Sequence, residues 1–408
     1  MQYEFDLLII GGGAAGFFTA INAAEINRNL KIAILERGKE VLTKVKVSGG
    51  GRCNVTHAEF LPDELTKNYP RGEKELLGPF HRFMTGDTIA WFEERGVELK
   101  TEADGRMFPI TDSSKTIIDC FHREVERLGI ELYLQSAVNK IEYDNSSWKV
   151  TTKDNVFIAK QVVIATGSNK KIWSLLESLG HTVVPPVPSL FTFNIKDERI
   201  EGLAGIATQA EVEVMDSDGK PLLNSEAPLL ITHWGMSGPA ILKLSAWGAR
   251  ILEPLGYHFN IRVNWLDGLG PEEVEQQLRE MKQTDGKKKL NSFPMFELPK
   301  RLWKQLVLAS GISENTTWAE LDKSGTLRLA HELTKGEFKV HGKSTFKEEF
   351  VTAGGVALEE VNFRTFESKL LPGLYFAGEV LNIDAITGGF NFQNAWTGGY
   401  LVAKAIAT

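Results

Sequence analysis

Cysteine is scarce in this sequence, since only Cys53 and Cys120 occur, and they form no C-x-x-C pair. This usage indicates a reducing compartment. Apolar runs approaching the ~18 residues of a membrane span are also absent. The first predicted strand begins at residue 5, which leaves no room for a signal peptide. We therefore expect a cytoplasmic protein that does not enter a membrane.

An excess of basic residues is absent as well. With a formal net charge of -7, the chain has no overall attraction for nucleic acid or anionic membrane, and we expect no nucleic-acid partner. No metal site is predicted. At 408 residues the chain is too long for one compact core, so two or three domains are expected.

What the sequence does contain is a glycine pattern directly after a predicted strand. The run 5–10 has the apolar density of a strand buried on both faces, and Gly11-Gly12-Gly13-Ala14-Ala15-Gly16 follows it at once. In a G-x-G-x-x-G turn, Gly11 permits the tight turn, Gly13 lets the backbone approach a pyrophosphate, and Gly16 lets the next helix pack closely. That helix, expected over 14–27, directs its N–H groups and positive dipole end at the phosphates.

An acidic residue follows at the spacing that a dinucleotide site requires. The predicted strand 31–35 ends in Glu36, twenty residues after Gly16. A carboxylate at this position accepts hydrogen bonds from an adenosine ribose. Strand, turn, helix and acid together predict dinucleotide binding; a glycine-rich turn used only for packing is the alternative.

A second glycine-rich segment, Ser48-Gly49-Gly50-Gly51-Arg52-Cys53-Asn54, is too long for a hairpin turn. Such a loop can wrap the far end of an extended ligand with its backbone amides. Nearby basic residues, which include Arg37, Lys44 and Arg52, raise the positive potential there. The alternative is a flexible, solvated linker.

Further along, the segment 138–159 alternates like an antiparallel meander. It leads into the buried strand 161–165, which ends in Thr166-Gly167. Open α/β sheets place ligands at the carboxyl ends of such strands. Beyond the proline cluster 185–188 the chain changes to short alternating strands and helices, and we expect 190–346 to be an inserted domain, mainly an antiparallel sheet or small barrel with appended helices.

The last sixty residues repeat the ingredients of the first site. The predicted strand 374–377 ends in Gly378-Glu379. Asp384, Gly388, Gly389, Phe390 and Asn391 then lead into an apolar helix that runs to the C-terminus. A strand, a small residue, an acid and a fresh helix N-terminus can bind the other half of a long ligand.

Together these features resemble the two-dinucleotide-fold FAD flavoproteins, and within them the HI0933/YhiN-like (BaiN-like) family of NAD(P)/FAD-dependent oxidoreductases. The segments that carry the resemblance are spread over nearly the whole chain: 11–16, Ser48–Asn54, Gly105–Pro109, Thr232–Pro239, Gly378–Val380 and Thr387–Gln393. The resemblance implies an α/β fold. A Rossmann-like FAD-binding domain (1–189 and 347–408), with a mostly parallel sheet and a β-meander, is interrupted by the insert.

The resemblance also implies which residues bind FAD. The ADP half is assigned to Gly11, Gly13, Gly16, Glu36 and Arg37, with Val138 beside the adenine. The pyrophosphate, ribityl chain and isoalloxazine are assigned to Gly378, Glu379 and the amides from Gly388 to Asn391. The complete expected set adds residues from the flanking turns: Ala14, Ala15, Lys44, Ser48, Gly49, Gly51, Arg52, Cys53, Asn54, Thr166, Gly167 and Asp384.

In such a protein FAD carries the hydride, while the protein binds, orients and tunes it. A helix N-terminus near Asn391 would stabilise negative charge on the reduced ring. Since no second G-x-G-x-x-G appears, no dedicated nicotinamide domain is expected, and NADH or NADPH is expected to bind only transiently. His233 is a candidate proton donor to a substrate carbonyl or alkene; a histidine satisfied by backbone is the alternative. Cys53 is a candidate flavin-adjacent thiol, although it lacks a partner cysteine.

Two interpretations of function remain. In the first, the protein is an FAD-dependent oxidoreductase that transfers a hydride between a nicotinamide or another reductant and a small, largely apolar organic substrate. In the second, FAD is structural or sensory, and the insert binds a macromolecule, as tRNA-modifying flavoproteins bind RNA. The acidic net charge favours the first.

Overall fold

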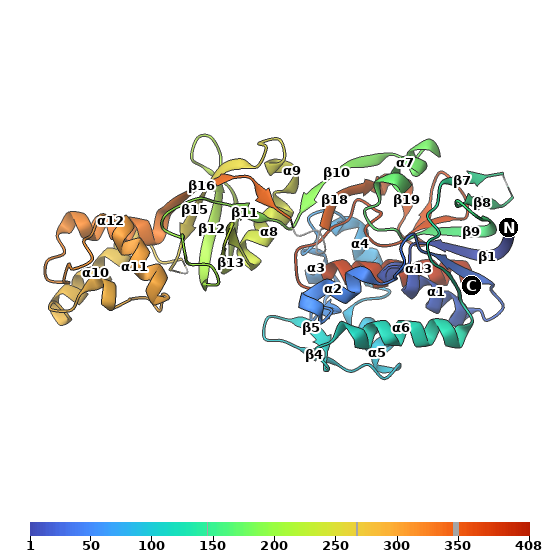
Figure 1. Cartoon of the computed structure of the whole chain (residues 1–408), viewed down its shortest axis with the longest axis horizontal. Coiled ribbons are helices and arrows are strands. Elements are labelled where there is room, and N and C mark those ends of the chain that lie inside the picture. The colour runs from blue at the N-terminus through green and yellow to red at the C-terminus, as the bar shows by residue number, and fades with distance from the viewer. Residues whose placement is uncertain (145, 267, 346–350) are drawn as a thin grey trace. The chain divides into compact units, whose positions relative to one another are not determined.

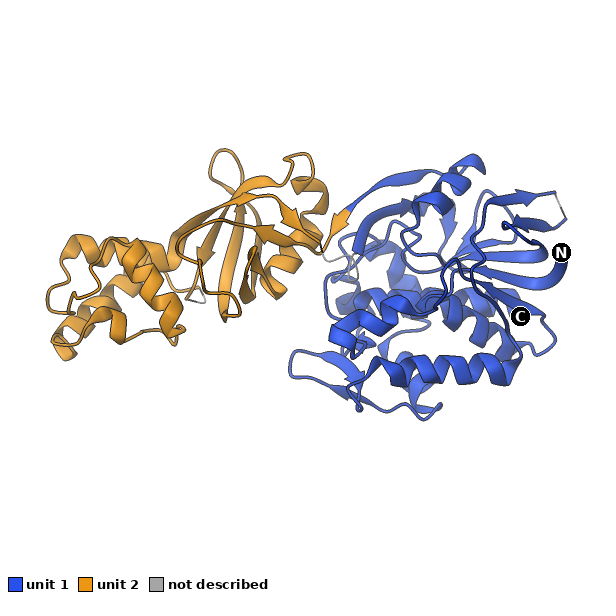
Figure 2. Cartoon of the chain, viewed as in Figure 1, with its two compact units in different colours: residues 1–187, 347–408 blue, residues 188–346 orange. Residues whose placement is uncertain are grey.

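The computed structural model describes residues 1–144, 146–266, 268–345 and 351–408. The chain forms two compact units, unit 1 (1–187 with 347–408) and unit 2 (188–346) (Figure 2). The insert was expected to span 190–346; unit 2 begins at Pro188, and the second expected limit lies outside the described residues.

Unit 1 is built on a mostly parallel sheet (Figure 1). Among the described residues its strand order is β19-β20-β21-β9-β1-β2-β6, and β21, β9, β1, β2 and β6 are mutually parallel. Strands β7 and β8 continue antiparallel from β9. The predicted α/β class, with a parallel Rossmann-type sheet and a meander, is confirmed.

The strands of unit 1 are β1 (Gln2–Ile10), β2 (Ile32–Leu35), β3 (Thr56–His57), β4 (Leu99–Thr101), β5 (Arg106–Pro109), β6 (Glu131–Tyr133), β7 (Lys140–Tyr143), β8 (Trp148–Thr151), β9 (Val156–Ile164), β10 (Val183–Ser189), β18 (Val351–Val356), β19 (Val361–Asn362), β20 (Glu367–Ser368) and β21 (Leu374–Phe376). Its helices are α1 (Ala14–Ile26), α2 (Thr43–Gly51), α3 (Pro62–Thr66), α4 (Glu73–Phe80), α5 (Thr85–Glu93), α6 (Ser114–Leu128), α7 (Lys170–Ser178), η2 (Leu358–Glu360) and α13 (Phe390–Ala407).

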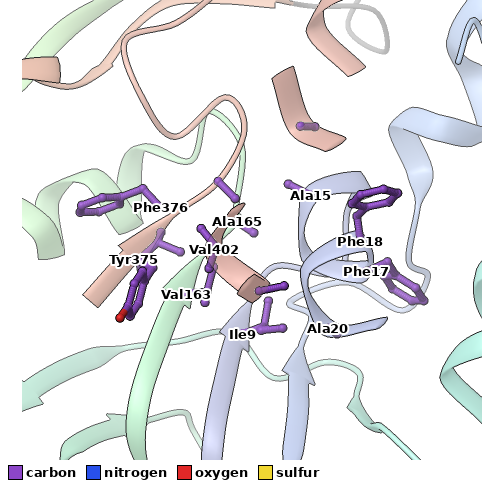
Figure 3. Packing of buried hydrophobic residues seen from close by; sticks show 14 of the residues in the cluster. Ile9, Ala15, Phe17, Phe18, Ala20, Val163, Ala165, Tyr375, Phe376 and Val402 are labelled. Atoms are coloured by element: carbon purple, nitrogen blue, oxygen red, sulfur yellow. The ribbon is translucent and has the colours of Figure 1, made fainter. Parts of the chain in front are cut away.

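The core of unit 1 lies between the central sheet and the helices α1 and α13. Ile9 of β1 and Val163 of β9 are paired in register and fully buried. Figure 3 shows them near Val402 of α13, with Phe18 on the neighbouring helix α1 in the same buried cluster. Because α1 has no polar face, both of its sides can be buried by these neighbours.

One local prediction differs from the structure, and a second agrees with it. The last strand of the meander and the buried strand before Thr166 are one continuous strand, β9, whose first half pairs with β8 and β1 together. The segment 48–54, expected as a loop, starts within the bounds of α2, but Ser48, Gly49 and Gly50 have non-helical φ/ψ angles, so the chain leaves the helix there as the prediction requires. The two predicted strands are one because Lys160, which lies between them in sequence, is an exposed strand position in an otherwise continuous β pattern.

Unit 2 is mainly an antiparallel sheet. Its described strand order is β16-β15-β12-β13-β14-β11-β17. β16 and β17 are separated only by Gly342; β16 pairs with β15 and β17 pairs with β11, so the two ends of the order meet, in agreement with the expected antiparallel sheet or small barrel. Its elements are β11 (Thr192–Asn194), β12 (Ala207–Met215), β13 (Pro221–Thr232), β14 (Gly235–Ser237), α8 (Pro239–Trp247), α9 (Ala249–Leu252), β15 (His258–Asn264), α10 (Pro271–Thr284), η1 (Leu290–Ser292), α11 (Lys300–Ala309), α12 (Lys323–Lys335), β16 (Gly336–His341) and β17 (Lys343–Ser344).

Two strands link the units in sequence. β10 runs out of unit 1 and pairs with β18, the strand by which the chain returns. The proline cluster expected to be a rigid exit is thus part of β10. None of the described helices is both long enough and apolar enough to span a bilayer.

Candidate functional site

The three glycines of the first turn have different roles. Gly11 has a φ of +119°, and a Cβ there would lie 2.3 Å from the Ala165 carbonyl oxygen of β9. A Cβ at Gly16 would lie 2.0 Å from the Gly11 oxygen, whereas a Cβ at Gly13 would have no heavy atom within 4 Å. Gly11 and Gly16 therefore serve packing, and Gly13 leaves the turn open to a ligand.

The N-terminus of α1 carries no neutralising group. Gly13 is its N-cap, no side chain caps it, and no acidic residue lies in its first turn. The first hydrogen bond of the helix runs from Phe17 N–H to the Gly13 carbonyl (3.1 Å). The amides of Ala14, Ala15 and Gly16 precede that bond, so they can donate to an anion.

Glu36 is held in a fixed orientation beside this turn. Its Oε2 accepts a hydrogen bond from Gly12 N–H (2.9 Å) and its Oε1 accepts one from Gly38 N–H (2.7 Å). Each oxygen retains a second lone pair for a ribose hydroxyl. No sequence pattern predicted the hydrogen bonds from Gly12 and Gly38, because these two amides come close to the Glu36 carboxylate only through the path of the chain after β2.

The other residues expected at the ADP end lie around Glu36. Arg37 is exposed. Val138 is buried, two residues beyond Ser136, whose backbone N–H donates to the Glu36 carbonyl (2.8 Å). Val138 and Glu36 are thus on neighbouring segments of unit 1.

The second glycine segment forms a left-handed turn at the end of α2. Gly49, Gly50 and Gly51 have φ values of 58°, 69° and 86°. A Cβ at Gly49 would lie 2.8 Å from the Phe108 ring, whereas Gly50 has no neighbour within 4 Å. Successive left-handed residues can aim backbone amides at one anion, and Gly50, which the sequence did not single out, is open to a ligand.

The side chains on either side of these glycines interact within the protein. Arg52 pairs with Glu102 and lies 3.9 Å from the centroid of the Phe108 ring. It was expected to raise the potential at a phosphate, but this pairing neutralises it. Ser48 Oγ donates to the Val45 carbonyl (3.0 Å).

Cys53 is fully buried, with a φ of 62°. Burial raises the pKa of its thiol to about 12, although a hydrogen bond with Ser48 acts in the opposite direction. The thiol therefore stays protonated at neutral pH, which does not suit redox exchange. Burial likewise raises the pKa of Cys120 to about 11.

Glu379 connects three segments that are distant in sequence. Its Oε2 lies 2.5 Å from Lys44 Nζ, and a Cβ on Gly167 would lie 3.5 Å from the same oxygen. Thr166 directly precedes Gly167, at the end of β9. Gly378 lies against Ala15 of α1, so that a Cβ on this glycine would contact the Ala15 side chain. The structure therefore joins Lys44, Thr166-Gly167 and Gly378-Glu379 beside the first glycine turn.

Two expected ligand-binding side chains instead hold the loop before α13. Asp384 is completely buried and pairs with both Nε and a terminal nitrogen of Arg71. Asn391 Nδ2 donates to the Ala385 carbonyl (3.1 Å), and Asn391 Oδ1 accepts from Ala385 N–H (3.0 Å). We interpret both side chains as supports of the loop, which leaves the backbone of this segment to meet a ligand.

The N-terminus of α13 is also without a side-chain cap. Gly389 is the N-cap with a φ of 98°, no acid lies in the first turn, and the first helical bond runs from Gln393 N–H to the Gly389 carbonyl (3.0 Å). A Cβ on Gly389 would lie 2.6 Å from the Thr56 backbone, and Gly388 contacts the Phe390 ring. The amides from Phe390 to Phe392 thus form a second anion-binding helix end.

A buried polar network that the sequence did not reveal fixes this helix end. Gln393 Oε1 accepts from Thr56 Oγ1 (2.6 Å) and Thr88 Oγ1 (3.0 Å), and its Nε2 donates to Thr397 Oγ1 (3.1 Å). Tyr69 donates its hydroxyl to the Phe390 carbonyl (2.6 Å). Only the glutamine in the predicted 387–393 motif could have drawn attention to it.

His233 lies apart from these residues in the sequence and belongs to unit 2. It is exposed in the turn between β13 and β14, and no described residue makes a hydrogen bond or ion pair with its ring. The alternative of a histidine satisfied by neighbouring backbone is therefore not what the structure shows.

The donors and acceptors of unit 1 fit FAD. Two side-chain oxygens, Glu379 Oε1 and Asn54 Oδ1, are buried and have no hydrogen-bond partner among the described residues. Such acceptors are costly unless a ligand supplies a donor. The hydroxyls of a ribityl chain and the N–H groups of a flavin are such donors, and the ends of α1 and α13 suit a pyrophosphate and an anionic ring.

Known proteins match nearly the whole length of this chain. The family model described as HI0933-like protein Rossmann domain matches residues 5–405. A ribosomal RNA dihydrouridine synthase of Haemophilus influenzae is 29% identical over 420 residues, covering 100% of this chain and 99% of the relative. A 3-dehydro-bile acid delta(4,6)-reductase of Clostridium scindens is 28% identical over 411 residues, covering 98% of each.

The fold is also found among solved structures. The 3-ketosteroid delta1-dehydrogenase from Sterolibacterium denitrificans matches with a TM-score of 0.52 and 10% identity, covering 99% of each chain. At this identity the likeness concerns the fold.

Proposed function

This chain belongs to the HI0933-like family of FAD-dependent oxidoreductases, and on that premise we propose that it reduces a carbon–carbon double bond conjugated to a carbonyl group. FAD supplies the two electrons as a hydride when it is bound. In the proposed reaction the substrate would gain a hydride at the carbon β to the carbonyl and a proton at the α carbon, and a nicotinamide, NADH or NADPH, would supply the electrons.

The names of the two relatives support this choice of bond. A dihydrouridine synthase saturates the C5–C6 bond of uracil, which is conjugated to a carbonyl, and a delta(4,6)-reductase of a 3-dehydro bile acid acts on an enone. The two substrates differ in size and charge, but each offers a planar, electron-poor six-membered ring. The two substrates therefore share this ring and differ in the molecule that contains it, which we call the carrier of the ring.

The observation that carries the proposal is the pair of helix ends without side-chain caps, at α1 and α13, together with the acceptor Glu379 Oε1, which has no hydrogen-bond partner among the described residues. Gly13 and the amides after it would hold the pyrophosphate, and Glu36 the ribose. The N-terminus of α13 would stabilise negative charge on the reduced ring. Glu379 would accept a hydrogen bond from the ribityl chain.

On the substrate side, His233 is the residue that we propose as proton donor. It is exposed and its ring has no described partner, so a proton can pass from its ring nitrogen to a substrate carbon. His233→Ala should slow oxidation of the reduced flavin by substrate and leave flavin content and reduction by nicotinamide nearly unchanged.

Two candidate functions differ in the carrier of the ring, which is either a small molecule or an RNA. A small apolar enone is favoured by the acidic chain and by the bile-acid reductase relative. A uridine in ribosomal RNA is favoured by the relative that covers 100% of this chain. This second candidate would make RNA a partner, contrary to the prediction from net charge.

The test is a two-step experiment on purified flavoprotein. NADH or NADPH should bleach the flavin anaerobically. Next, 4-androstene-3,17-dione and a ribosomal RNA transcript are added separately. Return of the oxidised spectrum, with the saturated steroid or dihydrouridine found by mass spectrometry, identifies the carrier. If neither compound reoxidises the flavin faster than buffer does, the proposed function is wrong.

A further inference from the structure

One tryptophan is placed unlike the rest. Of the nine tryptophans in the chain, seven are buried, Trp247 is 37% exposed, and Trp234 is 63% exposed. An indole offers one of the largest gains from burial of any side chain. No described residue makes a ring contact or a hydrogen bond with the Trp234 side chain, so the folded unit 2 leaves it available.

The backbone that carries Trp234 is held firmly. Thr232 Oγ1 accepts from Trp234 N–H (3.3 Å) and donates to the Gly235 carbonyl (3.2 Å), and Ile195 N–H donates to the Trp234 carbonyl (2.9 Å). Gly235 has a φ of +144°, and a Cβ there would lie 2.2 Å from the Phe193 oxygen. The indole is therefore displayed by a turn packed against β11, and its exposure is not a consequence of a loose loop.

Polar groups accompany the indole at this edge of the sheet. Asn194 pairs with Gly235 across β11 and β14, and its Oδ1 accepts from Ser344 Oγ (2.8 Å). Its Nδ2 donates to no group in the described parts of the chain. His233 adds a second exposed ring next to Trp234. A flat apolar surface with a free N–H donor nearby suits a planar ring that bears a carbonyl oxygen.

We propose that the turn 232–238 binds the planar, carbonyl-bearing ring of the substrate, with Trp234 stacking against its face and Asn194 Nδ2 donating to its carbonyl oxygen. The proposal rests on the proposed function, because that function supplies the ring. Stacking on an indole tolerates different rings, since every such ring presents a flat face. The same turn therefore suits a cyclic enone and a uracil.

The experiment compares full-chain flavoproteins carrying Trp234→Ala, Trp234→Phe, Asn194→Ala and, as a matched control, Trp247→Ala. Trp247 is the other exposed tryptophan of unit 2 and lies in α8, outside the turn. The probes are 4-androstene-3,17-dione and a uridine-rich RNA oligonucleotide. KM, kcat, flavin content and the rate of flavin reduction by nicotinamide are measured for each protein.

Trp234→Ala should raise KM for the probe that is turned over by about tenfold or more, with a much smaller change in kcat. Trp234→Phe should restore most of the affinity, Trp247→Ala should match wild type, and flavin content should be equal in all proteins. An unchanged KM in Trp234→Ala, or an equal loss in Trp247→Ala, would overturn the proposal.

Failure of the proposed function is distinguishable from failure of this inference. If the wild-type protein turns over neither probe, the function is wrong and binding alone is measured by quenching of tryptophan fluorescence. Quenching by a probe in the wild type and in Trp247→Ala, but not in Trp234→Ala, then supports the ring-binding turn. Equal quenching in all proteins, or none in the wild type, overturns it.

Discussion

Lys44 Nζ and Glu379 Oε2 lie 2.5 Å apart, although 335 positions separate the two residues in the chain. Lys44 comes from α2, and Glu379 follows the strand β21 at the carboxyl edge of the parallel sheet. The contact leaves the second oxygen of Glu379 buried without a described partner. This acid therefore combines a structural contact with an open acceptor.

From this arrangement we predict that Glu379→Ala weakens FAD binding by about tenfold or more, because the buried acceptor would be lost. Lys44→Ala should cost less, since the lysine side chain is 52% exposed and exposed ion pairs contribute little. The dissociation constant is measured by titrating apoprotein with FAD. Lys46→Ala, which removes an exposed pair with Glu40, is the control and should bind as wild type does. Wild-type affinity in Glu379→Ala would contradict the assignment.

A second prediction separates two glycines of one motif. Gly13→Val should fold but retain little flavin, because its side chain meets no protein atom and occupies the approach to the turn. Gly16→Ala should lower the thermal midpoint of the apoprotein strongly, because its Cβ would overlap the Gly11 oxygen. Glu36→Ala should weaken FAD binding less than Gly13→Val does.

Apoprotein melting curves and bound flavin per chain provide the readouts for both glycines. Gly78→Ala, in α4 and likewise free of neighbours within 4 Å, serves as the control; it should leave bound flavin unchanged and should not lower the melting temperature, because alanine is the better helix former. If Gly13→Val retained a full complement of flavin, the pyrophosphate would have to lie elsewhere.

A third prediction concerns the two units. Because β10 and β18 pair where the chain leaves and re-enters unit 1, joining about 189 to 347 with a short Gly/Ser linker should leave a folded core that binds FAD. Flavin content and circular dichroism of the shortened protein are the measurements. Insolubility with every linker tried would show that unit 1 depends on unit 2 for folding.

A fourth prediction concerns acid stability at the base of β10. Burial tends to raise the pKa of Glu360, but hydrogen bonds from the Thr182 side chain and backbone and the His181 contact outweigh it, so the pKa lies below its usual value of 4.5. A lowered pKa in the folded state stabilises the protein above the unfolded value, and this contribution is lost as the pH falls below about 4.5.

Glu360→Gln should therefore lower the free energy of unfolding by about 1–3 kcal/mol at pH 7 and have a smaller effect at pH 3. Urea unfolding at both values measures it. His181 Nδ1 lies 2.8 Å from Glu360 Oε2, and His181 Nε2 lies 3.0 Å from Ser368 Oγ, so the imidazole connects the carboxylate to the Ser368 segment. An equal loss at both pH values would contradict the ionic contribution.

The sequence alone was enough to predict the first half of the candidate site. The glycines from Gly11 to Gly16 and the acid Glu36 act through backbone conformation over a strand, a turn and a helix. Such a unit is local, so its spacing is readable from composition and periodicity. The same is true of Gly378-Glu379 before α13, whose strand and helix are also local.

The tertiary structure decided which side chains remain available to a ligand. Arg52 and Asp384 looked like ligand-binding charges in the sequence, but Glu102 and Arg71 neutralise them. Trp234 looked like one more aromatic residue of a motif, yet it is the most exposed of the nine tryptophans. Pairing and burial depend on contacts between segments tens to hundreds of residues apart, and the free energy of those contacts leaves no local pattern in the chain.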